Sequence, residues 1–140
     1  MPLLGAHEHT VGPNGRIIIP AKLRVDLGDD FVAVAVLDCL QLFPMSRWLE
    51  IEDRLRGENP FSEYTTDLLE YIGRNSALCS QDKQGRTTVP VGLLEEVGIK
   101  DNIVSVGAVD RIRVRSKERY QTQPRRGDAD MRALIERVLK

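Results

Sequence analysis

Apolar positions in the first half of the chain form short runs separated by turns. Ile17–Ile19, Phe31–Val36 and Leu40–Phe43 are rich in β-branched and other apolar residues and have the length of strands. Residues 21–27, between the first two runs, predict a short helix, and Gly28 is a natural stop for that helix. The pattern therefore predicts a small α+β unit rather than a long helix or a continuous apolar segment.

The same pattern returns in the second half, where residues 85–98 (GRTTVPVGLLEEVG) resemble residues 15–28 (GRIIIPAKLRVDLG). The identical pairs, 70 positions apart, are Gly15 and Gly85, Arg16 and Arg86, Pro20 and Pro90, Leu23 and Leu93, and Gly28 and Gly98. Each copy is predicted as strand, turn, strand, short helix, strand, turn, strand. A unit of about 40 residues buries too little apolar surface to be stable alone, so we expect two copies to share a core, within one chain or between subunits.

The chain accordingly divides into four predicted segments. They are a first unit over 1–48, a helical connector over 49–76, a second unit over 77–120, and a hinge with a C-terminal helix over 121–140. Pro60 breaks the connector into two helices. The second helix has an apolar side that we interpret as packing, formed by Tyr64, Leu68, Leu69, Tyr71 and Ile72. The C-terminal helix, expected to pack on its own chain or on a neighbour, has an apolar stripe of Met131, Leu134, Ile135 and Val138.

Charge is balanced overall but unevenly distributed. The 140 residues carry 20 basic and 21 acidic side chains, and the apolar runs are far shorter than the roughly 20 residues of a membrane span, so no membrane partner is predicted. Residues 50–70 are strongly acidic and residues 111–126 strongly basic. Arg111, Arg113 and Arg115 alternate along a predicted strand. We interpret them as an exposed polar face or a subunit interface with the acidic segment, with extra phosphate contact as the alternative.

Side chains typical of catalytic or metal sites are sparse. Cys39 and Cys79 are interpreted as free, half-buried residues, and His7 and His9 as surface or interface residues of a strand. The sequence lacks four-ligand zinc spacing, a nucleophile beside a base, and a phosphate-binding glycine loop. We therefore predict no enzyme, no metal and no small-molecule substrate.

Several short motifs resemble one family. In the first copy they are Gly5, His9-Thr10, Asn14-Gly15-Arg16, Ile17–Pro20 and Ala21-Lys22-Leu23-Arg24, and in the second they are Cys79, Asp82-Lys83-Gln84-Gly85-Arg86 and Pro90. Together they resemble the MraZ family of bacterial transcriptional regulators. The resemblance implies two tandem AbrB/SpoVT-type swapped-hairpin units around a pseudo-twofold β-barrel core. It also implies a homo-oligomer, with a ring expected, that binds promoter repeats of the division and cell-wall gene cluster, located in the cytoplasm with the nucleoid and needing no cofactor.

The family motif Asp-x-x-x-Arg places the expected DNA contacts on the two hairpins. The second copy keeps it as Asp82 and Arg86, whereas the first has Arg16 but Gly12 in place of the aspartate. An arginine can donate two hydrogen bonds to guanine, and lysines neutralise phosphates. The expected DNA-binding residues are Asn14, Arg16, Lys22, Arg24, Asp82, Lys83 and Arg86.

Two other functions stay open at this point. One is a general AbrB-type regulator or an antitoxin-like DNA binder, although antitoxins usually carry one unit and a disordered tail. The other is a ring-forming scaffold that has lost DNA binding. Two departures from the family pattern leave the scaffold open, namely Gly12 and Leu94, which stands where the first copy has Arg24. The same departures fit a divergent member of the family or one with altered operator preference.

Overall fold

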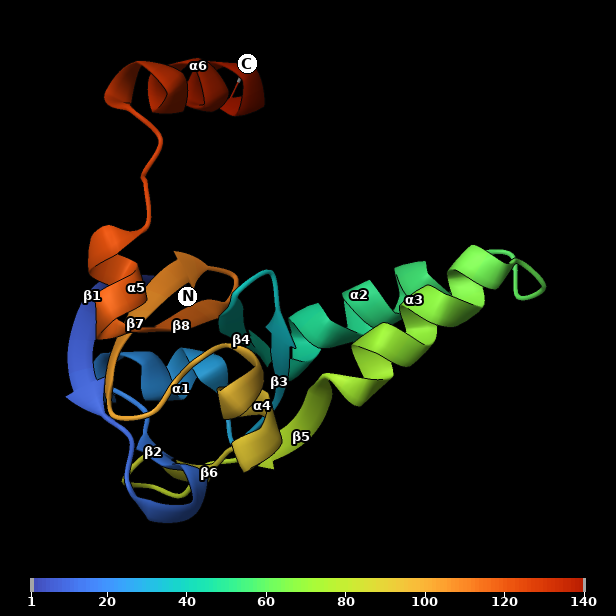
Figure 1. The fold of residues 1–140 in the computed structure, drawn as a ribbon. Coiled ribbons are helices and arrows are strands. Elements are labelled where there is room, and N and C mark those ends of the chain that lie inside the picture. The colour runs from blue at the N-terminus through green and yellow to red at the C-terminus, as the bar shows by residue number, and fades with distance from the viewer. Residues whose placement is uncertain (1, 140) are drawn as a thin grey trace.

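The computed structural model describes residues 2–139 and contains the two copies in the predicted order (Figure 1). The strands of the first copy are β1 (Leu3–Thr10), β2 (Arg16–Ile18), β3 (Asp30–Val36) and β4 (Cys39–Pro44). A 3-10 turn over Ala21–Leu23 and the short helix α1 (Arg24–Leu27) separate β2 from β3. The second copy consists of β5 (Ser76–Ser80), β6 (Arg86–Thr88), α4 (Val91–Glu96), β7 (Asn102–Val109) and β8 (Ile112–Ser116).

Strand pairing interlocks the two copies. Within the described residues, one antiparallel sheet has the order β1-β7-β8-β4-β3-β5, and β2 pairs with β6 as a separate two-stranded ribbon. The first strand of each copy therefore pairs with the third strand of the other, because β1 lies on β7 and β5 lies on β3. The fourth strands pair with each other at the centre. This exchange gives the chain an approximate twofold symmetry and the shared core that its repeat predicts.

Apolar side chains pack on both faces of the sheet at β3 and β4. The main core lies between the sheet and the ribbon with its short helices, and includes Leu3, Ile17, Phe31, Val89 and Ile112. A smaller cluster on the opposite face packs Val32, Val34 and Phe43 against the helix α2 (Met45–Arg56). Burial on both sides explains why the β3 sequence is continuously apolar instead of alternating. The cysteines lie in this interior, so the expectation of half-burial is wrong: Cys39 and Cys79 are 0% and 5% exposed, and both are free.

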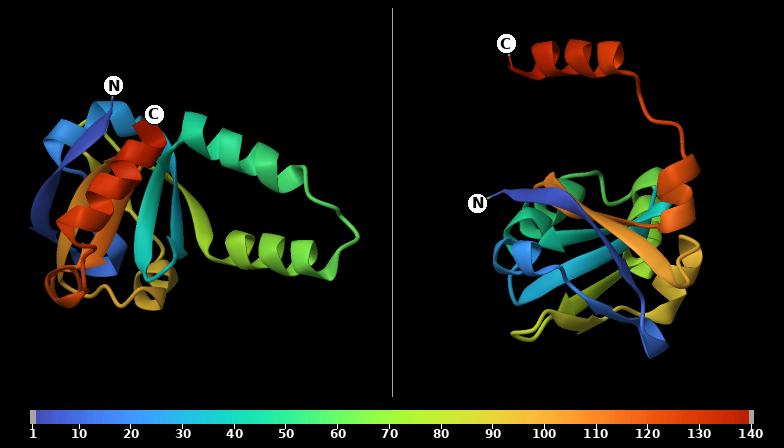
Figure 2. Two further views of the ribbon diagram at one scale, coloured as in Figure 1. Left: turned by 90° about the horizontal axis from the view of Figure 1, so that it is seen from above. Right: turned by 90° about the vertical axis from the view of Figure 1, so that its left-hand side faces the viewer.

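The connector forms two antiparallel helices that extend away from the sheet, α2 (Met45–Arg56) and α3 (Glu63–Arg74) (Figures 1 and 2). Ser62 caps α3 by accepting a hydrogen bond from the Thr65 amide. The expected packing of the α3 apolar side is wrong for most of its members. Tyr64 is 89% exposed, and Leu68, Leu69 and Tyr71 are also exposed, because the helices project beyond the sheet that would have covered them.

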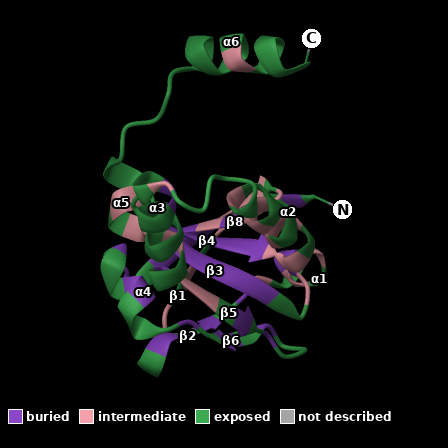
Figure 3. Cartoon of the chain, turned by 90° about the vertical axis from the view of Figure 1, so that its right-hand side faces the viewer, coloured by how far each residue is buried: buried purple, intermediate pink, exposed green. Residues whose placement is uncertain are grey.

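The C-terminal part of the chain leaves the body. Helix α5 (Lys117–Thr122) packs on β7 and β8, and a hinge then leads to α6 (Asp128–Leu139), which stands apart from the sheet (Figures 1 and 2). Figure 3 shows α6 exposed along almost its whole length. Within residues 2–139, no helix is both long and apolar enough to span a membrane.

Two glycines bring the hairpin backbones of the two copies close together. The Val89 amide donates to the Gly15 carbonyl at 2.9 Å, and the Ile19 amide donates to the Gly85 carbonyl at 2.8 Å. Both glycines have left-handed backbones, with φ of 79° and 78°. A Cβ on Gly15 would collide with the Val89 carbonyl oxygen, and one on Gly85 would lie 2.7 Å from that of Ile19. Neither position has room for a side chain.

We expect Gly15→Ala to lower the free energy of unfolding by at least about 1–3 kcal/mol, because it adds both backbone strain and a collision with the partner strand. Urea unfolding measures the change. Gly73→Ala is the matched control, since nothing lies within 4 Å of a Cβ there and the residue is inside α3. That variant should gain about 0.5–1 kcal/mol. Equal effects at the two positions would contradict this account of the ribbon.

Candidate nucleic-acid interface

The β2–β6 ribbon presents one polar face to solvent. In its register Arg16 lies opposite Thr88, and Ile18 opposite Arg86, and all four side chains are exposed. The central pair, Ile17 and Thr87, points inward and is buried. This is the period-two alternation of a strand pair with one face on a core. The two expected reading arginines therefore lie on the same outer face.

The arginines occupy diagonal positions on that face. Diagonal neighbours across antiparallel strands lie roughly 7–8 Å apart. Arg16 and Arg86 also line an open groove of about 780 Å³, whose other side includes Thr10, Leu78 and Ser80 from the ends of β1 and β5. The ribbon is thus a two-stranded projection with a cationic side chain from each copy.

The second hairpin holds its arginine with the aspartate of the motif. Asp82 Oδ1 accepts hydrogen bonds from the Gln84 and Arg86 amides, each at 2.9 Å, and Asp82 Oδ2 accepts from Arg86 Nε at 2.6 Å. The backbone hydrogen bond from Arg86 is the largest cause that holds the pKa of Asp82 below its ordinary value, followed by that from the Arg86 side chain. One carboxylate therefore fixes the turn and orients the guanidinium.

The first hairpin closes without a carboxylate. The Arg16 amide donates instead to the Pro13 carbonyl, at the end of a 3-10 turn over Pro13–Gly15. Asn14 makes this turn possible by adopting a left-handed backbone with φ of 61°. Gly12 still pairs with Arg16, since its amide donates to the Arg16 carbonyl at 2.7 Å. Among residues 2–139, the Arg16 guanidinium has no hydrogen-bonding or ion-pair partner, so it is free to move.

The remaining expected contacts fall into two groups. Lys22 and Lys83 are exposed beside the ribbon. Arg24 is half-buried instead, and its Nε donates to the Ile19 carbonyl at 2.8 Å. Leu94, its counterpart, is buried beside Gly15. The same site beneath each hairpin is therefore filled by a guanidinium in one copy and by a leucine in the other.

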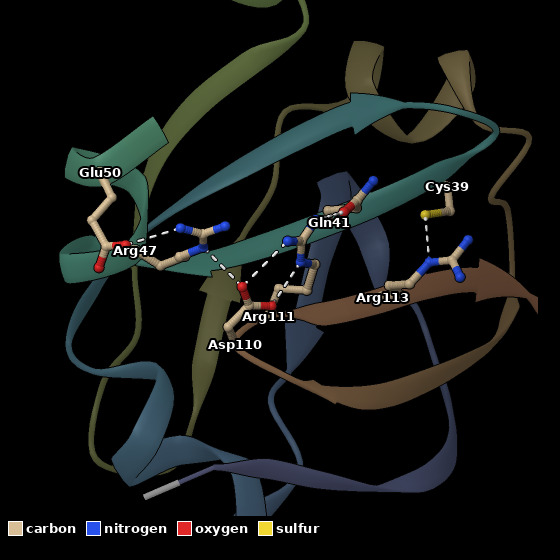
Figure 4. Close-up of polar contacts among 7 residues, drawn as sticks. All are labelled: Cys39, Gln41, Arg47, Glu50, Asp110, Arg111 and Arg113. Carbon is tan, nitrogen blue, oxygen red and sulfur yellow. Dashed lines mark hydrogen bonds and ion pairs between the residues drawn. The ribbon is translucent and has the colours of Figure 1, made fainter. Parts of the chain in front are cut away.

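The arginines at β8 are used within the chain, so the expectation of an exposed polar face is wrong. Arg111, Arg113 and Arg115 are all half-buried, on the sheet face opposite the main core. Arg111 donates to Gln41 Oε1 at 3.1 Å (Figure 4). The Arg111 guanidinium carbon also lies 4.8 Å from the centre of the Phe43 ring. Arg113 Nε lies 3.5 Å from the Cys39 sulfur.

Asp110 is the acidic partner of this cluster. It accepts from Arg111 Nε at 2.9 Å and from Arg47 Nε at 2.8 Å, and Arg47 also pairs with Glu50 (Figure 4). The hydrogen bond from Arg111 lowers the pKa of Asp110, against the opposing effect of partial burial. The acidic segment thus contributes one residue, Glu50, through Arg47. A role of these arginines between subunits stays a prediction.

The histidines lie half-buried on β1, where His9 Nε2 is 2.6 Å from Ser105 Oγ of β7. Burial lowers the pKa of His9, and the neighbouring His7 adds to this effect. No group of three or more histidine, cysteine, aspartate or glutamate side chains within residues 2–139 is arranged to hold a metal ion.

Comparison with known proteins identifies the family. The family described as "MraZ protein, putative antitoxin-like" matches residues 3–71 and again residues 74–140. The transcriptional regulator MraZ of Clostridium beijerinckii is 36% identical over 118 residues, which cover 84% of this chain and 83% of that protein. The MraZ regulator of Clostridium acetobutylicum is 32% identical over 136 residues, or 96% and 95% of the two chains. The chain belongs to the MraZ family.

Two outward residues of this MraZ ribbon were missed by the sequence reasoning. Ile18 is 55% exposed between the two arginines, and Thr88 lies opposite Arg16. In a strand with one buried face, alternate residues point outward, so burial of Ile17 and Ile19 leaves Ile18 exposed. The sequence did not reveal this alternation, because three consecutive isoleucines show no contrast between apolar and polar positions.

The depressed pKa of Asp82 gives this MraZ chain a pH-dependent hairpin. A carboxylate whose pKa is lower in the folded state stabilises that state fully above the unfolded pKa, roughly 4. This stabilisation is lost as pH falls through the folded pKa. We therefore expect the difference in unfolding free energy between wild type and Asp82→Asn to be largest near pH 7 and to shrink below about pH 4. Urea titrations across this range measure it, and a difference that does not vary with pH would contradict the role of the carboxylate.

Proposed function

We propose that the chain is a sequence-specific DNA-binding transcriptional regulator that contacts promoter DNA through the β2–β6 ribbon. The observation that carries the proposal is the exposed two-stranded ribbon with Arg16 and Arg86 on the same outer face. The major groove of B-DNA, about 12 Å wide, admits a two-stranded antiparallel ribbon. The names of the MraZ relatives support a regulator of transcription.

Base reading is assigned to the two arginines. Each guanidinium can donate to O6 and N7 of a guanine, and the diagonal spacing of roughly 7–8 Å is close to two base-pair steps of about 3.4 Å. Arg86 is oriented by Asp82 before DNA arrives, whereas Arg16 must be ordered on binding. Ordering a long side chain costs free energy, so Arg86 should contribute more to affinity.

Phosphate contacts are assigned to the side chains around the ribbon. Lys22 and Lys83 are exposed cations, and Asn14 lies at the tip of the first turn. Arg24 is assigned a supporting role, because it donates a hydrogen bond to the Ile19 carbonyl and so holds the backbone next to the second hairpin. Asp82 contributes by holding Arg86 and does not itself approach the phosphates.

The wider proposal follows the family. Two units, over 1–48 and 77–120, form one swapped-hairpin pair, with the connector over 49–76 and the hinge and last helix over 121–140 attached. With a net charge of −1, one chain has little general attraction for DNA. A homo-oligomer would place several ribbons on promoter repeats and raise affinity through effective concentration. The promoters of the division and cell-wall gene cluster are the proposed targets, in the cytoplasm at the nucleoid.

Affinity for DNA from upstream of the gene, against a scrambled duplex, tests the proposal. Arg16→Ala and Arg86→Ala should each lose about 1–3 kcal/mol of binding to the specific duplex, with the larger loss for Arg86. Specific affinity should also fall steeply as salt rises. Fluorescence anisotropy over a salt series measures both effects.

Arg54→Ala is the matched control, because Arg54 is an exposed arginine on the connector, far in sequence from either hairpin. This variant should bind as wild type does. Weak, equal binding of all variants to both duplexes would overturn the proposal and favour a scaffold that does not bind DNA.

A further inference from the structure

An exposed apolar stripe runs along α3 and the turn before it. Tyr64, Leu68 and Tyr71 follow one another at intervals of four and three residues, so they share one side of α3, and Phe61 lies in the turn before the helix. Phe61 is 94% exposed and Tyr64 is 89% exposed. The adjoining side of the same helix holds the buried Thr65. Large aromatic side chains thus lie next to a packed face but are themselves uncovered.

A second uncovered stripe lies on α6. Met131, Leu134 and Val138 follow at intervals of three and four residues, with Ile135 beside them. Leu134 is half-buried and the other three are exposed. Helices α3 and α6 each have 12 residues, or about 18 Å of helix, so the two helices match in length. Figure 3 shows both helices exposed.

Charges beside the stripes are complementary in one orientation. Asp67 precedes Arg74 by seven residues on one flank of α3, and Asp130 precedes Arg137 by seven residues on the corresponding flank of α6. Corresponding flanks face each other when two helices pack antiparallel. Asp67 then meets Arg137, and Arg74 meets Asp130. Asp67, Asp130 and Arg137 make no ion pair within the described part of the chain.

We propose that α6 of one copy packs antiparallel on the apolar stripe of α3 in a second copy. The two ion pairs fit a single register. Moving seven residues forward along α3, from Asp67 to Arg74, corresponds to moving seven residues backward along an antiparallel α6, from Arg137 to Asp130. Leu68 then inserts between Leu134 and Val138, and Tyr71 between Met131 and Leu134, as side chains interdigitate in helix pairs. The proposal rests on the proposed homo-oligomer and names the surfaces that build it.

A contact between α3 and α6 in this register covers Leu68 and Tyr71 of α3 together with the stripe of α6 in every copy. Pairing of α3 with a second α3 would leave every α6 stripe exposed and would bring Glu63, Asp67 and Glu70 of the two helices together. The proposed contact joins different surfaces, so it continues from copy to copy and closes into a ring or extends as a chain. The hinge of five residues, 123–127, spans at most about 18 Å, which keeps each α6 near its own body.

Mass measurement on the full chain by light scattering tests the proposal. Wild type should have a multiple of the single-chain mass of 15.8 kDa. Leu68→Asp and Ile135→Asp should each weaken self-association at least tenfold while circular dichroism reports an intact fold, since both side chains are exposed. Val25→Asp is the matched control, an 88% exposed apolar residue outside both stripes that should keep the wild-type mass.

A charge exchange decides which helices meet. Asp67→Arg and Arg137→Asp should each lower the mass, and the double variant should recover it. An equimolar mixture of the two single variants should also recover it, because each α3 then finds a matching α6 in the other variant. Recovery on mixing excludes folding of α6 onto its own α3.

Three results would overturn the proposal. The first is a wild-type chain with the single-chain mass. The second is a lower mass for Leu68→Asp but not for Ile135→Asp, which would indicate pairing of α3 with a second α3. The third is a mixture of the two charge variants that does not recover the wild-type mass. The Arg16→Ala/Arg86→Ala double variant separates this inference from DNA binding, because it should keep the wild-type mass whatever happens to its affinity for DNA.

Discussion

Neither copy of the repeat can complete its own sheet, and this constraint governs the whole structure. Among residues 2–139, the outer strand β1 pairs only with β7, and β5 pairs only with β3. The ribbon repeats the exchange on a smaller scale, with Gly15 and Gly85 each accepting a hydrogen bond from the opposite copy. The hairpins are therefore positioned by backbone pairing across the repeat.

Because backbone hydrogen bonds hold the two copies together, the side chains on the two hairpins are free to differ from each other. Asp82 closes one turn by its carboxylate, whereas the Pro13 carbonyl closes the other. Arg24 and Leu94 fill equivalent sites with different chemistry. The two arginines still emerge on one face, since the ribbon register alone determines that.

The repeat made most of the fold predictable from the sequence. Matching Gly-Arg-x-x-x-Pro motifs located both hairpins, and the β-branched runs located the strands, because these features depend on local backbone preferences. The apolar pattern by itself did not predict the exchange of strands between copies, since pairing within a copy and pairing between copies both satisfy it. Helix α3 misled the prediction for a related reason. An apolar side indicates a face that needs cover, but the sequence does not say whether its own chain supplies that cover.

The candidate site was predicted in part. Arg16 and Arg86 were identified from the duplicated motif, and the structure places them together on one exposed face. Arg24 looked like another exposed cation, because nothing in its neighbourhood of the sequence reveals the Ile19 carbonyl that it supports. The β8 arginines likewise found partners, Gln41 and Cys39, more than 60 residues away.

Joining both units in one chain has a consequence for the symmetry of any target. Two identical one-unit chains would form a ribbon with equal strands, and such a twofold object reads palindromic sites most naturally. Here Gly12 stands in one strand's turn where Asp82 stands in the other, so the ribbon has a head and a tail. If the ribbon reads DNA as proposed, it would distinguish the two orientations of an asymmetric sequence, and copies arranged head to tail would all point the same way along a promoter.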